Sequence, residues 1–102
     1  MVQINWSIQA KEDLKDIAHY ISKDSKRYAR RQVKKIKDHI KILNPHLRAG
    51  KITPEFENPK VRELVEGNYR IIYYIANENR IDILTVHHGA RDLYRRNIEG
   101  LF

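Results

Sequence analysis

The sequence predicts an α+β fold in two layers, in which an antiparallel helical hairpin packs on an antiparallel sheet. Two N-terminal segments carry apolar side chains at the three- and four-residue spacing of a helix. Three later segments are rich in β-branched and aromatic residues and are joined by short turns, which is typical of an antiparallel meander. Because each helix has one apolar stripe, both stripes are expected to be buried on one face of the sheet.

Residues 2–6 alternate apolar and polar side chains, which predicts a short N-terminal strand. Ser7 is suited to cap a first helix over about residues 8–22. A second helix is expected over about residues 25–43, because Pro45 disfavours its continuation. This helix has a narrow apolar seam at Ala29, Val33, Ile36, Ile40 and Leu43.

Residues 45–60 contain all three prolines and are expected to form a loop. Three strands follow, over residues 61–65, 69–76 and 80–88. Residues 91–98 are expected to form a short C-terminal helix. The chain has the length of one domain, which would span residues 1–102.

The charge balance is strongly basic, with 20 Lys and Arg against 13 Asp and Glu, a net charge of +7. A small domain of this charge favours a polyanion or an acidic protein as partner, although a basic surface also serves solubility alone. The sequence has no Cys, no N-terminal apolar signal region and no apolar run of the about 18 residues that a membrane span requires. We therefore expect a cytoplasmic protein that does not bind membranes.

The histidines do not predict a metal site, and no cofactor is expected. His19, His39 and His46 have no partner at the spacing of metal ligands. His87 and His88 are adjacent, so their rings would point to opposite faces of a strand and would not hold one ion together.

The alternation of side chains along the strands predicts which of them face the helices. With three-residue turns centred on Gly67 and Glu78, Leu64 lies opposite Arg70 and Arg70 lies opposite Val86. The odd-numbered face is the more apolar and should lie under the helices: Val61, Val65, Ile71, Tyr73, Ile75, Ile81 and Ile83. The other face then holds Arg62, Leu64, Arg70, Ile72, Tyr74, Asp82, Leu84, Val86 and His88. It is either a site with two arginines and a histidine, in which a register shift of one would replace His88 by His87, or a solvated surface.

Three stretches resemble motifs of the RelE/ParE superfamily of toxins. Residues 10–21, AKEDLKDIAHYI, resemble the A-x-x-D-L-x-x-I-x-x-Y-I pattern of ParE-type members. Residues 61–74, VRELVEGNYRIIYY, resemble the R-E-L and Y-R-I-I-Y signature of the superfamily. Residues 83–93, ILTVHHGARDL, are similar to its I-L-x-V-x-H-G-x-R-D segment. The three stretches follow in the family's order, and the β-α-α-β-β-β order expected from periodicity is also the family's fold.

This resemblance implies a growth-inhibiting toxin of a type II toxin–antitoxin system, which a cognate antitoxin neutralises in a hetero-oligomer. ParE-like members poison DNA gyrase and have no recognised catalytic site. RelE-like members cut mRNA on the ribosome without a metal. The first helix and the length of chain beyond the last strand resemble ParE-like members more closely, so we expect gyrase as the target, with the ribosome and its mRNA as the alternative.

Five residues are candidates for catalysis if the chain is a ribonuclease. Metal-free RNA cleavage needs a 2′-OH that loses its proton, a leaving oxygen that gains one, and a stabilised phosphorane. Arg70 and Arg62 would hold phosphate oxygens, because the guanidinium fork matches them. His87 or His88 would be the acid or base, and Glu55 resembles a loop glutamate that some ribosome-dependent members use as the base.

The second helix carries a dense basic run that would bind rRNA phosphates or acidic residues of the antitoxin. The binding candidates are Arg27, Arg30, Arg31, Lys34 and Lys35 in this run and Arg91 beyond the last strand. A solvated helix face is the alternative. A third interpretation of the whole chain is a non-toxic, basic nucleic-acid-binding module whose tyrosines stack on bases.

Overall fold

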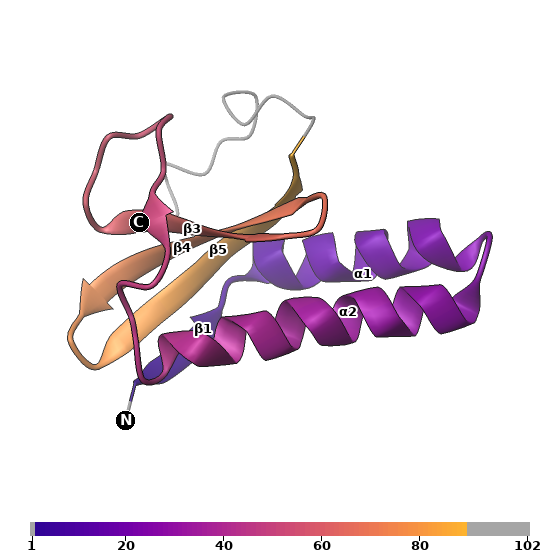
Figure 1. The fold of residues 1–102 in the computed structure, drawn as a ribbon, viewed down its shortest axis with the longest axis horizontal. Helices are drawn as coiled ribbons and strands as arrows, with labels where there is room; N and C mark the ends of the chain where they lie inside the picture. Colours follow the sequence, from indigo (N-terminus) through magenta and orange to yellow (C-terminus); the bar gives the residue numbers. More distant parts are fainter. Residues whose placement is uncertain (1, 90–102) are drawn as a thin grey trace.

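A helical hairpin packs against a five-stranded sheet in the computed structural model, which describes residues 2–89 (Figure 1). The elements are β1 (Gln3–Trp6), α1 (Ile8–Ser22), α2 (Lys26–Ile40), the 3₁₀ turn η1 (Lys41–Leu43), β2 (Lys51–Ile52), β3 (Val61–Glu66), β4 (Tyr69–Asn77) and β5 (Arg80–His88). The predicted α+β class, with its N-terminal strand, helical hairpin and C-terminal meander, is confirmed. The helix predicted over residues 91–98 lies outside the described residues.

The strands are ordered β1-β5-β4-β3-β2 across the sheet. The β3, β4 and β5 strands form the antiparallel meander, and β2 adds to β3 in the antiparallel direction. The sequence predicts an antiparallel sheet, but β1 pairs with β5 in parallel. Parallel neighbours need a long crossover connection, which the helical hairpin and the meander supply here. Neither helix of the described part of the chain is long and apolar enough to cross a membrane.

Both helices begin at a serine cap, of which the sequence predicts Ser7. The Ser7 hydroxyl accepts a hydrogen bond from the Ala10 amide at 3.0 Å, and the Ser25 hydroxyl accepts one from the Tyr28 amide at 3.1 Å. Each bond satisfies an amide that the first turn of a helix leaves without a backbone partner. Ser7 also donates to the Leu84 carbonyl at 2.7 Å, so the start of α1 is tied to β5.

Asp13 is a buried charged residue that joins α1 to β5. It is 5% exposed and accepts hydrogen bonds from the Thr85 hydroxyl and from the Val86 amide. The Gln9 amide group donates to its other oxygen at 2.8 Å. A buried carboxylate needs such donors to offset its lost hydration, and these three supply them.

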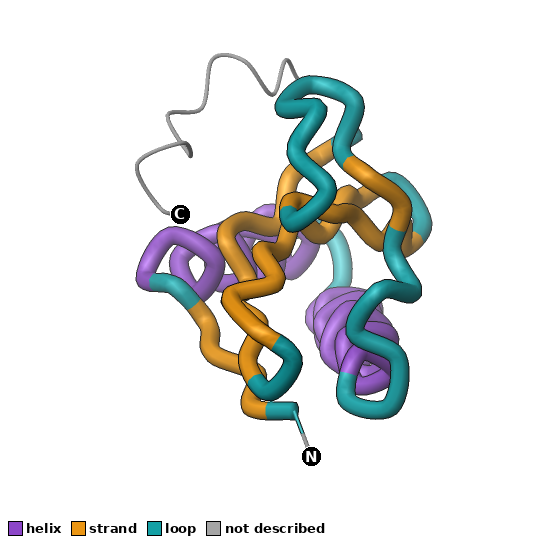
Figure 2. Tube along the Cα trace, turned by 90° about the vertical axis from the view of Figure 1, so that its left-hand side faces the viewer, coloured by secondary structure: helices purple, strands orange, loops and turns teal. Residues whose placement is uncertain are grey.

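The main core lies between the helices and the sheet. Its buried members are Ala10, Leu14, Ile36, Ile40, Leu43, Leu64, Ile71, Tyr73, Ile75, Ile81, Ile83 and Val86, with the half-buried Trp6 packed against them. A smaller cluster of Val61, Ile72 and Leu84 lies on the other face of the sheet. Phe56 covers it from the loop between β2 and β3, which lies on the far side of the sheet from α2 (Figures 1 and 2).

The predicted three-residue turns are wrong, and both hairpins have two-residue turns. Glu66 pairs with Tyr69, which leaves Gly67 and Asn68 as the first turn. Gly67 has a φ of 58°, which suits the first central position of a type II′ turn. Asn77 pairs with Arg80 across the second turn. The register of the β4–β5 pairing shifts twice, at two bulges. Ala76 is an extra residue on β4, and Leu84 is an extra residue on β5.

The corrected register moves six side chains to the face opposite to the predicted one. Leu64 and Val86 belong to the helix-side core, while Val61 belongs to the cluster on the other face. Arg62 lies opposite Tyr73 and His88 opposite Tyr69, so both lie on the helix side, and Val65 lies opposite Arg70 on the other side. A one-residue change in a hairpin loop reverses the facing of a whole strand, which explains the error.

The segment before β3 contains a short strand that the sequence does not predict. β2 pairs Lys51 with Glu63 and Ile52 with Arg62 at the edge of the sheet. The buried Tyr73 hydroxyl fixes the segment just before β2. It accepts a hydrogen bond from the Gly50 amide at 2.9 Å and donates one to the Leu47 carbonyl at 2.9 Å.

Candidate functional site

Four of the chain's ionisable side chains meet on the sheet face away from the helices. Arg70 on β4 lies opposite His87 on β5, and Glu63 reaches Arg70 from β3. Glu55 reaches it from the loop that covers this face. We call Glu55, Glu63, Arg70 and His87 the carboxylate–arginine cluster. Three of its members are predicted site residues, which the sheet and the loop bring together.

Arg70 is held by two carboxylates at once. Its Nη1 and Nη2 donate to the two oxygens of Glu55 at 2.6 and 2.8 Å. Its Nε and Nη2 donate to the two oxygens of Glu63 at 3.0 and 2.9 Å. Both pairs are therefore bidentate, the geometry in which a guanidinium binds a carboxylate most strongly. The side chains of Arg70, Glu55 and Glu63 are 15%, 16% and 3% exposed.

These ion pairs shift the titration of their members. Hydrogen bonds from Arg70 lower the pKa of Glu55, and the nearby His87 lowers it further. The hydrogen bonds to Glu55 and then Glu63 raise the pKa of Arg70. Glu55 is thus kept ionised, and a carboxylate with a lowered pKa is a weaker base.

The cluster in this arrangement does not offer a free positive charge to a phosphate. The two carboxylates exceed the single guanidinium by one negative charge, and they occupy four of its donor directions. His87 is 1% exposed, so its ring does not reach a substrate in solution. A general acid or base must approach the proton that it transfers to within about 3 Å, directly or through one water.

Two predicted members lie elsewhere. The Arg62 guanidinium donates to the backbone oxygens of Pro59 and Gly50, both at 3.0 Å, on the helix side of the sheet. The His88 ring packs edge-on against Tyr69 with ring centres 5.5 Å apart. The prediction that Arg62 and His88 share a face with Arg70 is therefore wrong, and His87 is the histidine beside Arg70. The two-residue turn at Gly67 and Asn68 explains the position of Arg62, and the two-residue turn at Glu78 and Asn79 explains that of His88.

Glu63 is the member that sequence reasoning missed. It is 4% exposed overall and lies two residues before Val65, which is opposite Arg70. Gly67 could have revealed Glu63, because a glycine at the first central position favours a two-residue turn. That turn places Glu63 on the same sheet face as Arg70.

The basic run of α2 lies on the opposite side of the sheet from this cluster. Its predicted binding residues are all exposed: Arg27, Arg30, Arg31, Lys34 and Lys35. Lys34 pairs with Asp38 at 2.5 Å, and Lys41 pairs with the same carboxylate at 3.4 Å. Arg91, the remaining binding candidate, lies outside the described residues. Across residues 2–89, no three His, Asp or Glu side chains are grouped as metal ligands.

The fold is shared with toxins of type II toxin–antitoxin systems. A structure described as the chromosomal ParDE toxin–antitoxin system from P. aeruginosa matches with a TM-score of 0.70 and 25% identity, over 86% of this chain and 96% of that chain. The YoeB dimer from Staphylococcus aureus matches with a TM-score of 0.60 and 21% identity, over 85% and 95% of the two chains. The YoeB–YefM complex from the same organism matches with a TM-score of 0.56 and 20% identity, over 86% and 97%.

The sequence itself assigns the chain to one family of these toxins. Residues 4–93 match the model of the ParE toxin of the type II toxin–antitoxin system parDE. The chain therefore belongs to the ParE toxin family, and it is a toxin of the type II class. No curated protein is a significant match.

Proposed function

We propose that this chain is a cytoplasmic toxin that stops growth by poisoning DNA gyrase, and that a cognate antitoxin neutralises it. Membership of the ParE family and the 25% identity with the ParDE structure support this target. The observation that carries the proposal is the closed carboxylate–arginine cluster. His87 is buried, and Arg70, whose side chain is 15% exposed, is already occupied by two carboxylates.

Ribosome-dependent mRNA cleavage is the second candidate. It is favoured by the meeting of Glu55, Arg70 and His87, the three residue types that metal-free cleavage requires. In that mechanism Glu55 takes the 2′-OH proton, His87 protonates the leaving oxygen and Arg70 stabilises the phosphorane. It requires Glu55 to leave Arg70 so that a phosphate can take its place.

The test is to incubate the purified chain with gyrase and supercoiled DNA, and in parallel with translating ribosomes and a labelled mRNA. Trapped DNA cleavage or lost supercoiling, with intact mRNA, is the expected result. mRNA cleavage with unaffected gyrase would overturn the proposal in favour of the ribonuclease.

Glu55→Gln is the variant that separates the two candidates. It has the shape of glutamate but cannot act as a base, and Arg70 keeps its bidentate pair with Glu63. We expect gyrase inhibition within about twofold of the parent chain, whereas loss of a general base lowers a reaction by about 10²–10⁴-fold. Circular dichroism of the variant controls for folding.

A further inference from the structure

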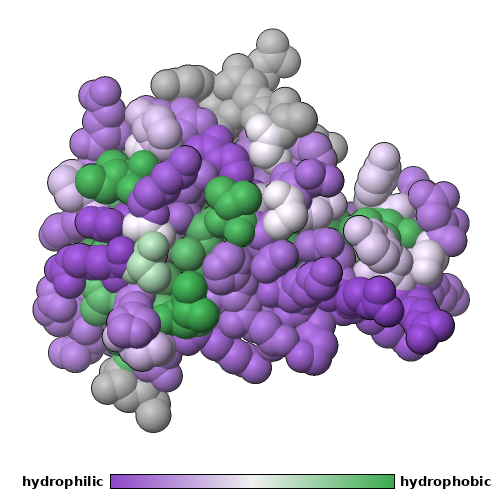
Figure 3. All heavy atoms as spheres, in the orientation of Figure 1, coloured by the Kyte–Doolittle hydropathy of each residue, from purple (hydrophilic) through white to green (hydrophobic). Residues whose placement is uncertain are grey.

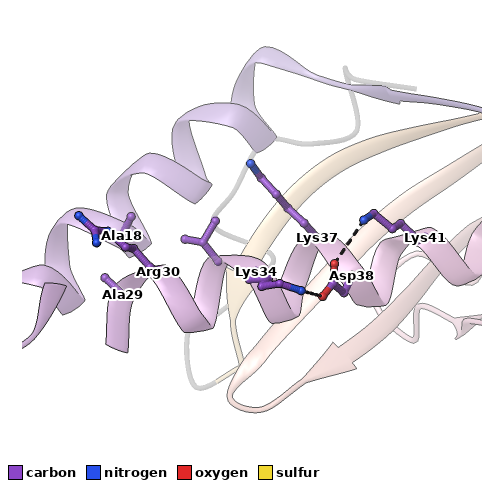
Figure 4. Close-up of a pocket in the computed structure, with 8 residues that line it drawn as sticks. Ala18, Ala29, Arg30, Lys34, Lys37, Asp38 and Lys41 are labelled. Atoms are coloured by element: carbon purple, nitrogen blue, oxygen red, sulfur yellow. Dashed lines mark hydrogen bonds and ion pairs between the residues drawn. The ribbon is translucent and has the colours of Figure 1, made fainter. Parts of the chain in front are cut away.

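The cations of α2 fall into two groups on different sides of the helix. One group lines a hollow beside α1 and consists of Arg30, Lys34, Lys37 and Lys41. Two of these lysines are partly neutralised, because Lys34 and Lys41 both reach the Asp38 carboxylate, at 2.5 and 3.4 Å (Figure 4). The second group is exposed and does not line this hollow: Arg27, Arg31 and Lys35.

The second group forms a row along one flank of α2. Residues four apart are neighbours on a helix surface, so these three cations follow one another at about 6 Å and span about 12 Å. Tyr28 is 54% exposed and lies three residues before Arg31, which places it on the same flank. We call Arg27, Tyr28, Arg31 and Lys35 the basic row.

The basic row is open to a large ligand. The N-terminal half of α2 extends beyond the end of the sheet, so no strand covers that end of the row (Figure 1). Hydrophilic side chains cover most of α2 in the same view (Figure 3).

The described part of the chain does not neutralise the basic row. None of the ion pairs within residues 2–89 includes Arg27, Arg31 or Lys35. Like charges four residues apart destabilise a helix. Arg27 also lies in the first turn, which has no acidic residue and where the helix dipole disfavours a cation. The row therefore opposes the stability of α2 unless an anion lies against it.

We propose that the basic row binds the phosphate backbone of duplex DNA. Guanidinium and ammonium groups and the tyrosine hydroxyl all donate hydrogen bonds to phosphate oxygens. A line of cations complements a ligand whose negative charges also repeat along a line, as the phosphates of a duplex do. The choice of DNA over RNA rests on the proposed gyrase target, which acts on DNA.

Two other occupants fit the basic row less well. A single strand is held by several aromatic side chains that stack on successive bases, and Tyr28 is the only Tyr, Phe or Trp in α2. A protein partner binds through a buried apolar centre, which a flank of exposed cations and one tyrosine ring does not provide.

The experiment uses the full chain and a fluorescent DNA duplex of mixed sequence, without gyrase. Binding is followed by fluorescence anisotropy over a range of salt concentrations. The single strand and an RNA duplex of the same sequence are measured beside it. Because gyrase is absent, failure of DNA binding leaves the result of the gyrase assay standing, and failure of gyrase inhibition leaves the DNA-binding result standing.

Matched charge variants locate the binding. Arg27→Gln/Arg31→Gln/Lys35→Gln removes the three cations of the row and keeps good helix formers. Its slope of log affinity against log salt should be shallower by about 2.7, because each phosphate contact contributes about 0.9. The control variant, Lys15→Gln/Lys51→Gln/Lys60→Gln, loses the same net charge at exposed positions outside the row. We expect the row variant to lose about tenfold or more in affinity and the control less than about threefold, because phosphate contacts are local.

Two conservative variants separate charge and hydrogen bonding from folding. Arg27→Lys/Arg31→Lys keeps both charges and should keep the parent's salt slope. Tyr28→Phe removes the hydroxyl donor and should weaken binding by about threefold. Tyr20→Phe, at a tyrosine of α1 that is 71% exposed, should bind as the parent does.

Three results would overturn the proposal. Absence of duplex binding at low salt would remove the site. Equal losses in the row variant and the control variant would reduce binding to net charge. An RNA duplex or a single strand bound about tenfold more tightly than the DNA duplex would assign the row to a different nucleic acid.

Discussion

At the scale of single residues, Arg70 holds together the charged side chains on the sheet face away from the helices. Its guanidinium lies between Glu55 and Glu63 in the carboxylate–arginine cluster, and all three side chains are nearly buried. Breaking a buried ion pair leaves a charge without hydration or partner, which costs far more than losing a surface pair. The residue therefore serves stability even if it has no role in catalysis.

Arg70→Met keeps the length of the side chain and removes its charge. We expect the free energy of unfolding to fall by about 3–5 kcal/mol, as for other buried pairs that lose one partner. Arg48→Met is the matched control, because Arg48 pairs with Glu78 at the surface, where both side chains are more than half exposed. The control should lose less than about 1 kcal/mol in the same urea titration. Equal losses in the two variants would contradict the burial argument.

Acid should weaken the same cluster. The pKa of Glu55 is lower in the folded chain than in the unfolded one, because Arg70 donates hydrogen bonds to the carboxylate. Its contribution is therefore complete above the ordinary glutamate pKa of about 4.3 and is lost as the pH falls through the folded value. Urea midpoints measured from pH 7 to pH 3 should fall less in Glu55→Gln than in the parent chain. Glu78→Gln changes an exposed ion pair, so the decrease in its urea midpoint should be closer to that of the parent chain.

The sequence predicts individual site residues better than it predicts their neighbours. Glu55, Arg70 and one histidine of the pair were identifiable from residue type and resemblance. Glu63 was not, and Arg62 was wrongly added, because both assignments depend on whether the Gly67 turn has two or three residues. Side-chain alternation carries no information on that length, whereas turn chemistry does.

At the scale of elements, α1 is fixed to β5 by polar bonds as well as by apolar contacts. Ser7 bonds to the Leu84 carbonyl, and Asp13 accepts from Thr85 and Val86. These contacts surround Leu84, the extra residue on β5. A bulge leaves backbone groups outside the regular ladder, and here the side chains of Ser7 and Asp13 bond to backbone groups beside it.

The two helix caps should therefore differ in strength. Ser25→Ala removes one capping bond and should cost about 1 kcal/mol. Ser7→Ala removes a capping bond and also the donor to the Leu84 carbonyl, so its cost should exceed that of Ser25→Ala by about 1 kcal/mol. Chemical denaturation of both variants gives the comparison. A smaller loss for Ser7→Ala would show that the contact with Leu84 does not contribute.

Element positions were predictable because each depends on local pattern. Apolar spacing located α1 and α2, with Ser7 marking the start of α1, and dense β-branched and aromatic runs located β3, β4 and β5. β2 was not predicted, because two residues are too few to show alternation. The pairing of β1 with β5 was not predicted either, because strands that are far apart in the sequence leave no local signal of their pairing.

At the scale of the whole molecule, charge divides between the two sides of the sheet. One side holds the closed carboxylate–arginine cluster, and the other presents the exposed basic residues of α2.

The pairing of β1 with β5 also determines when the toxin can fold during its synthesis. Gln3 pairs with Arg80, so the first strand made must wait for 77 further residues before its neighbour exists. At an elongation rate of about 5–20 residues per second this delay is about 4–15 s, and pairing across so long a separation is slow in itself. Until β5 emerges, the edge of β1 and the carboxylate of Asp13 have no partners on the sheet. Nascent chains arrested before β5 should therefore be cut readily by protease, so that an interrupted message produces no folded toxin.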